Sequence, residues 1–231
     1  MKGPRKAMGI AGVILLIQLF FLIPTITGTR LLPGDWTQYQ PQFLLYIIMD
    51  LGALGLVYGF GKAERDVREG SLNDFIIRGF VWGFSTWVVL SLIFGGLFAG
   101  GTSLTASAKV PALVYLAFYV APTEELLFRE VLPSTPPPSL RNSKVLWPIF
   151  ASGVMFAGFH VWAYGLSEPT LSGLVSALAF PFLLGIVFYG IYRYAPFGGY
   201  GAVTFIHFIY DAFVLGAITS LHFLPAWVVP L

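Results

Sequence analysis

The sequence contains no cysteine and few charged residues. Its 231 residues include 13 Lys and Arg, 11 Asp and Glu, and three His. The absence of Cys excludes disulfide bonds, thiolate metal ligands, a cysteine nucleophile and lipid attachment to a thiol. Charged residues make up 10% of the chain, against about one quarter in soluble domains. The net charge of +2, with scattered basic residues, also argues against a nucleic-acid-binding surface.

Hydrophobic residues make up 57% of the chain and occur in long runs. Because a transmembrane helix needs about 20 apolar residues, a chain of this length accommodates about seven or eight spans and no further soluble domain. We therefore expect an all-α fold, a polytopic transmembrane helical bundle that forms one integral membrane domain over 1–231. The expected spans are 8–28, 42–60, 75–99, 110–131, 145–164, 171–193, 200–217 and a shorter segment near 218–231.

The distribution of Lys and Arg predicts how these spans are oriented. When they are threaded alternately across the bilayer with the N-terminus in the cytoplasm, ten basic residues fall on the cytoplasmic side and Arg129 falls near it. Only Arg30 and Lys109 fall on the other side. We therefore expect a multi-pass protein of the cell membrane with a cytoplasmic N-terminus.

Ionisable residues inside apolar spans are the informative positions, because each costs about 3 kcal/mol on insertion scales. Glu125 and Arg129 are four residues apart on one helix face, so we expect an ion pair, more often structural than catalytic. Glu124 points about 100° away and is left without that partner. Asp50 has no evident role and is expected to pair within the bundle. The full set is Asp50, Glu124, Glu125, Arg129, His160, His207 and Asp211.

Two further segments place histidines one helical turn from a potential partner. FAGFH puts His160 four residues after Phe156, and HFIYD puts Asp211 four residues after His207. An Asp at this spacing can orient the imidazole ring. Taken alone, each His is more often structural, but together with Glu124 they favour hydrolysis by an activated water. Glu124 would remove the proton, one His would hold the water, and another donor would stabilise the oxyanion.

Two histidines and a carboxylate are also a plausible catalytic zinc set with an open fourth position. The sequence contains neither HExxH nor Cys. We therefore expect a glutamate-activated water and no required cofactor. If the protein depends on zinc, the ligands are Glu124, His160 and His207.

The order EExxxR, FxxxH and HxxxD, each on its own span, resembles the CPBP family of intramembrane proteases. This family includes the type II CAAX prenyl endopeptidases and bacteriocin-processing enzymes. The resemblance covers roughly 115–215, within a motif-bearing core of about 110–217. The matching residues are Glu124, Glu125, Arg129, Phe156, His160, His207 and Asp211.

The resemblance implies that Glu124 activates the water with His160, and that His207 and residue 211 stabilise the tetrahedral oxyanion. Glu125, Arg129 and Phe156 are then supporting residues. The implied substrate is a peptide or a prenylated protein tail held close to membrane lipid. The chain departs from the prenyl endopeptidases at Asp211, where they usually have Asn. Because an ionised Asp cannot donate a hydrogen bond, Asp211 is either protonated or only orients His207.

Helix geometry raises one difficulty for this site. At 1.5 Å per residue, Glu124 lies about 10 Å from the cytoplasmic end of its span, and His160 lies about 20 Å from the end of its own. The two are level only if the span of His160 starts nearer Pro148 or a kink at Pro122 shifts the span of Glu124. Either case predicts a water-filled site that opens towards the cytoplasm.

We therefore expect an intramembrane endopeptidase that cleaves near the cytoplasmic membrane face. Two alternatives come from other classes. A proton- or ion-coupled transporter would use the same residues as a relay, but the inverted repeats typical of many transporters are not evident. A non-catalytic membrane scaffold or immunity protein would tolerate replacement of Glu124 and His160.

Overall fold

The computed structural model describes residues 2–27, 34, 36, 39–60, 81, 85, 88, 104, 106–132, 146–161, 170–195 and 199–214. Within these ranges every regular element is helical and there is no strand, so the predicted all-α fold is confirmed for the described part of the chain. The expected spans at 75–99, apart from three isolated residues, and at 218–231 lie outside the described residues.

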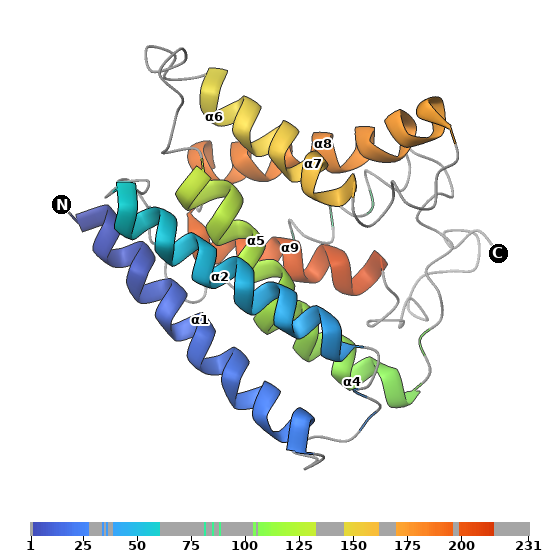
Figure 1. The fold of residues 1–231 in the computed structure, drawn as a ribbon. Coiled ribbons are helices and arrows are strands. Elements are labelled where there is room, and N and C mark those ends of the chain that lie inside the picture. Colours follow the sequence, from blue (N-terminus) through green and yellow to red (C-terminus); the bar gives the residue numbers. More distant parts are fainter. Residues whose placement is uncertain are drawn as a thin grey trace.

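Three helical segments form one side of the bundle. Helices α1 and α2 pack side by side, and the segment that carries Glu124 lies next to α2 (Figure 1). That segment is helical from end to end but contains two π-helical stretches, η3 and η4, one on each side of α5. The elements are α1 (Lys2–Thr27), α2 (Gln40–Phe60), α4 (Ala106–Tyr115), η3 (Leu116–Val120), α5 (Ala121–Glu125) and η4 (Leu126–Val131).

The other side of the bundle carries the histidine segments. Helix α9 packs against both α5 and α8, and the segment that ends in α7 packs along α8 (Figure 1). This segment also contains a π-helical stretch, η7. The elements are α6 (Leu146–Phe150), η7 (Ala151–Met155), α7 (Phe156–His160), α8 (Leu171–Tyr194) and α9 (Tyr200–Val214).

The described helices are consistent with a membrane protein. Two of them, Ser107–Val131 and Leu171–Tyr194, are long and apolar enough to cross a membrane, and two shorter apolar helices cover Ala7–Ile23 and Gln42–Tyr58. Large apolar side chains on α1 and α2 are exposed, as expected of surfaces that face lipid. They include Leu16, Phe20, Ile23, Ile48 and Leu51. The number of spans and the orientation of the N-terminus remain predictions.

Two local features position the site. The helix continues through Pro122, which has no N–H to donate, directly after the π-helical stretch η3. Gly185 of α8 lies so close to η7 that a Cβ would come within 2.4 Å of the Ser152 carbonyl oxygen. This contact brings α8 against the segment that carries His160.

Candidate active site

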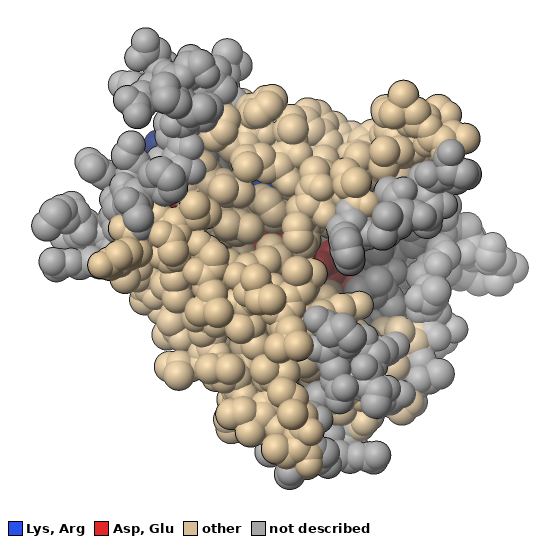
Figure 2. Space-filling view, viewed as in Figure 1, with Lys and Arg blue, Asp and Glu red and all other residues tan. Residues whose placement is uncertain are grey.

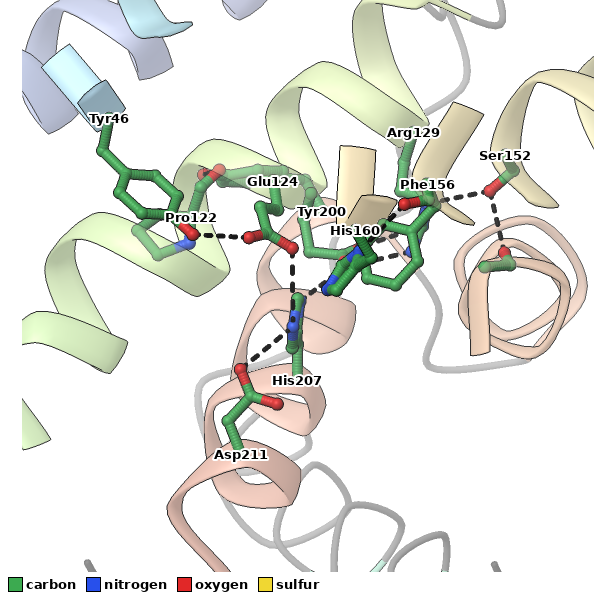
Figure 3. A network of polar contacts seen from close by, with 12 residues as sticks. Tyr46, Pro122, Glu124, Arg129, Ser152, Phe156, His160, Tyr200, His207 and Asp211 are labelled. Atoms are coloured by element: carbon green, nitrogen blue, oxygen red, sulfur yellow. Dashed lines mark hydrogen bonds and ion pairs between the residues drawn. The ribbon is translucent and has the colours of Figure 1, made fainter. Parts of the chain in front are cut away.

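Glu124 is buried, with 2% of its surface exposed, and its two carboxylate oxygens have different surroundings. Oε1 accepts a hydrogen bond of 2.6 Å from the hydroxyl of Tyr46, which comes from α2 (Figure 3). Oε2 accepts no hydrogen bond from the described residues and lies 3.9 Å from Nε2 of His207. One oxygen is therefore fixed, whereas the other is directed towards the histidine.

The predicted ion pair between Glu125 and Arg129 is confirmed. Arg129 Nε lies 2.9 Å from Glu125 Oε2, and Nη2 donates to Oε1 at 3.2 Å, with both side chains fully buried. Nη1 of Arg129 donates to the Ser152 hydroxyl at 2.8 Å, and this hydroxyl donates to the Gly185 carbonyl at 2.8 Å. The guanidinium carbon also lies 4.9 Å from the centroid of the Phe156 ring. These contacts offset part of the desolvation cost of the buried charges.

His207 is held at both ring nitrogens. Nδ1 lies 2.8 Å from Glu125 Oε1, and Nε2 lies 3.2 Å from Asp211 Oδ2. Asp211 is 21% exposed, whereas His207 is only 3% exposed, so the carboxylate forms the more open end of the pair. Two protonation states satisfy these contacts: an imidazolium that donates to both carboxylates, or a neutral ring that donates through Nδ1 to Glu125 and accepts from a protonated Asp211.

His160 is oriented by its own helix. Its Nδ1 lies 2.8 Å from the carbonyl oxygen of Phe156, which can only accept, so Nδ1 carries the proton and the lone pair of the neutral ring is on Nε2. The ring centroids of His160 and Phe156 are 4.5 Å apart. His160 and His207 both interact electrostatically with the Glu124 carboxylate, and Figure 3 shows the three side chains in one group.

The structure therefore brings Glu124 and His160 together, although their estimated depths differed by about 10 Å. The estimate assumed α-helical rise throughout. Both helical segments contain π-helical stretches, where that rise does not hold, and their ends were known only from the sequence.

Three contributing residues were not identified from the sequence. Tyr46 binds Glu124, Ser152 binds Arg129, and the Tyr200 hydroxyl donates to the carbonyl of Pro122 at 2.9 Å. Only Tyr46 had a sequence signal: it lies one turn before Asp50 in an otherwise apolar span.

Asp50 pairs within the bundle, as expected, but not in the Glu124 group. Its Oδ2 accepts a hydrogen bond of 2.9 Å from Thr123, the neighbour of Glu124. Thr123 in turn accepts a hydrogen bond of 3.1 Å from the Gln18 side chain of α1. This second polar network ties α1 and α2 to the helix that carries Glu124.

The arrangement does not fit a zinc ion as it stands. Among the described residues no group of three or more His, Cys, Asp or Glu side chains is placed to hold a metal. His207 is engaged at both nitrogens, by Glu125 and by Asp211, so in this arrangement it has no ring nitrogen left to bind zinc. A zinc ion would therefore require His207 to give up its contact with Glu125 or with Asp211.

The fold and the site define a helical membrane protein with a buried glutamate and histidine centre. Residues 105–213 match the family described as "Type II CAAX prenyl endopeptidase Rce1-like". The match confirms the resemblance predicted from the three motifs, and it covers a little under half of the chain. No curated protein and no solved structure matches the chain significantly. The matched region contains all of the predicted site residues, whereas α1 and α2 lie outside it.

Proposed function

We propose that this protein is an intramembrane endopeptidase in which Glu124 activates the water that cleaves a peptide bond. The observation that carries the proposal is the asymmetry of the Glu124 carboxylate. Tyr46 holds Oε1, while Oε2 lies 3.9 Å from His207 Nε2 with no hydrogen bond from the described residues, and both histidines interact electrostatically with the carboxylate. A carboxylate oxygen in this position can accept a proton from a bound water. The family match supports a peptide in the membrane as the substrate, and a prenylated CAAX-type tail in particular.

In the proposed reaction, a water molecule is held by His160 and gives a proton to Glu124 Oε2. The resulting hydroxide forms a bond to the carbonyl carbon of the scissile peptide, and the carbonyl oxygen becomes the oxyanion. His207, as an imidazolium, donates through Nε2 to that oxyanion. Glu124 then returns its proton to the leaving amine as the C–N bond breaks, which restores the carboxylate.

The ion pair between Glu125 and Arg129 supports the role of His207. Glu125 accepts from Nδ1, which keeps the ring oriented and favours its cationic form. Asp211 lies at the other nitrogen and competes with the oxyanion for the same N–H. In this proposal Asp211 orients His207 until the substrate carbonyl arrives, and it does not itself donate.

Access to the site is consistent with a substrate that approaches from one face. Figure 2 shows acidic side chains recessed below the surrounding surface near the middle of the face that is viewed in Figure 1. Asp211, with 21% exposure, is more open than Glu124 or His207. We propose that the recess opens towards the cytoplasm, as the distribution of basic residues predicts.

The test is cleavage of a farnesylated peptide with a CAAX terminus by the purified protein in liposomes. Wild type is compared with Glu124→Gln and His160→Ala, and the same peptide without the farnesyl group is the matched substrate control. We expect wild type to cleave the farnesylated peptide and both variants to lose about 100-fold or more of kcat, because Glu124→Gln loses the base and His160→Ala loses the group that holds the water. Equal rates in all three folded proteins would overturn the assignment. Proton uptake without cleavage would support the transporter alternative.

A further inference from the structure

We infer that Tyr46 is a positioning residue for the proposed general base Glu124. This inference rests on the proposed function and extends it to α2, which lies outside the region that matches the family. Tyr46 does not belong to any of the three motifs. Its importance follows from its contact alone: the hydroxyl lies 2.6 Å from Glu124 Oε1, in the distance range of a hydrogen bond to an ionised oxygen.

The Tyr46 side chain is itself held in place. It is buried, and its ring packs edge-on against Tyr115, with the centroids 5.6 Å apart. A ring that is packed in this way has few rotamers available, so the direction of its hydroxyl is defined before any substrate binds. Tyr46 can therefore fix the orientation of a carboxylate rather than simply follow it.

Two side-chain hydrogen bonds also connect α2 and α5 at this point. Tyr46 and Asp50 lie one turn apart on α2, and they bind the consecutive residues Glu124 and Thr123. Two attachments at successive positions fix both the register and the rotation of α5 against α2. The position of the Glu124 carboxylate is thus set by α2 as well as by its own helix.

The consequence concerns which oxygen of Glu124 can act as the base. With Tyr46 on Oε1, only Oε2 is directed towards His207. Without the hydroxyl, the carboxylate can rotate and present either oxygen in several orientations. Because misplacement by about 1 Å can cost about 100-fold in rate, the loss should appear in kcat. KM should change little, since Tyr46 acts on Glu124 and not on the substrate.

The experiment compares Tyr46→Phe with Tyr119→Phe. Tyr119 is a suitable control because it is also buried and its hydroxyl also makes a hydrogen bond of 2.6 Å, but to the backbone carbonyl of Gln18. With the farnesylated peptide, we expect Tyr46→Phe to lower kcat by about 10- to 100-fold with KM changed less than about threefold. Tyr119→Phe should change neither constant by more than about threefold. Glu124→Gln gives the rate without the base.

A second measurement does not depend on proteolysis. Dicyclohexylcarbodiimide enters membranes and forms an N-acylurea with accessible carboxyl groups, which mass spectrometry detects on the peptide that contains Glu124. We expect faster labelling of Glu124 in Tyr46→Phe than in wild type or Tyr119→Phe, because Oε1 is no longer covered by the hydroxyl.

The outcomes separate this inference from the proposed function. If wild type is active and Tyr46→Phe matches it in kcat, the inference is wrong while the protease assignment stands. Equal losses in both Phe variants would also overturn the inference, since they would indicate a purely structural effect. If no protein cleaves the peptide, the rate of carbodiimide labelling of Glu124 is the test. Equal labelling rates in wild type, Tyr46→Phe and Tyr119→Phe would overturn the role of Tyr46. A faster rate in Tyr46→Phe alone would support it.

Discussion

Nδ1 of His207 lies 2.8 Å from Oε1 of Glu125, and this contact joins the buried ion pair to the proposed reaction centre. The same oxygen accepts from Arg129 Nη2 at 3.2 Å. Charged groups therefore alternate along a chain from Arg129 through Glu125 and His207 to Asp211. Each carboxylate in this chain has a cationic or potentially cationic neighbour, which is how a low-dielectric site tolerates several charges.

Replacement of Glu125 should destabilise the protein, whereas replacement of Glu124 should abolish its activity and leave it folded. Glu125→Ala leaves the guanidinium of Arg129 buried without its anionic partner, and breaking such a pair costs about 3–5 kcal/mol. Glu124→Gln keeps the volume and the contact with Tyr46, so the protein should stay folded but lose its activity. Thermal unfolding and cleavage, measured on both variants in the same detergent, check this prediction. A stable Glu125→Ala beside an unfolded Glu124→Gln would contradict it.

Asp211→Asn should keep or raise kcat. The amide can still accept a hydrogen bond near Nε2 of His207, and unlike an ionised carboxylate it can donate one to the oxyanion. Asp211→Ala removes both possibilities and should lower kcat by about tenfold or more. Steady-state kinetics with the farnesylated peptide provide the comparison. An inactive Asp211→Asn would show instead that the negative charge is needed, and the proposed imidazolium of His207 would then depend on it.

Gly185 should be intolerant of substitution for steric reasons. In Gly185→Ala the new Cβ would lie 2.4 Å from the Ser152 carbonyl oxygen and 3.0 Å from the Cα of Gly153, both backbone atoms that yield only if the helices separate. We expect the free energy of unfolding to fall by about 1–3 kcal/mol or more. The contact between Ser152 and Arg129 should also be disrupted. Gly190→Ala on the same helix is the control, because no described atom lies within 4 Å of its added Cβ. The melting temperature should be lowered only in Gly185→Ala.

The contacts that the sequence predicted well are those within one helix. The spacing of four residues is enough to place Arg129 against Glu125 and Asp211 against His207, because the α-helix brings such pairs onto one face. The assembly of the motifs from separate helices came from the family resemblance rather than from periodicity.

Contacts between helices that belong to no motif could not be predicted in this way. Tyr46 is 78 residues from Glu124, and Ser152 is 23 residues from Arg129. The spacing of one turn between Tyr46 and Asp50 marks a polar helix face but does not identify its partner on another helix, and Ser152 has no such signal. The sequence also did not predict the π-helical stretches on each side of α5.

Removal of divalent metals should leave the activity unchanged. His207 is held by carboxylates at both nitrogens, so it is not arranged as a zinc ligand beside Glu124. Cleavage of the farnesylated peptide should therefore proceed at the same kcat with and without 1,10-phenanthroline, whereas a zinc peptidase assayed in parallel should lose its activity. If the chelator inactivates this protein and added zinc restores it, Glu124, His160 and His207 become the candidate ligands. In that case His207 must give up its contact with Asp211 when zinc binds, because its Nε2 lies 3.2 Å from Asp211 Oδ2.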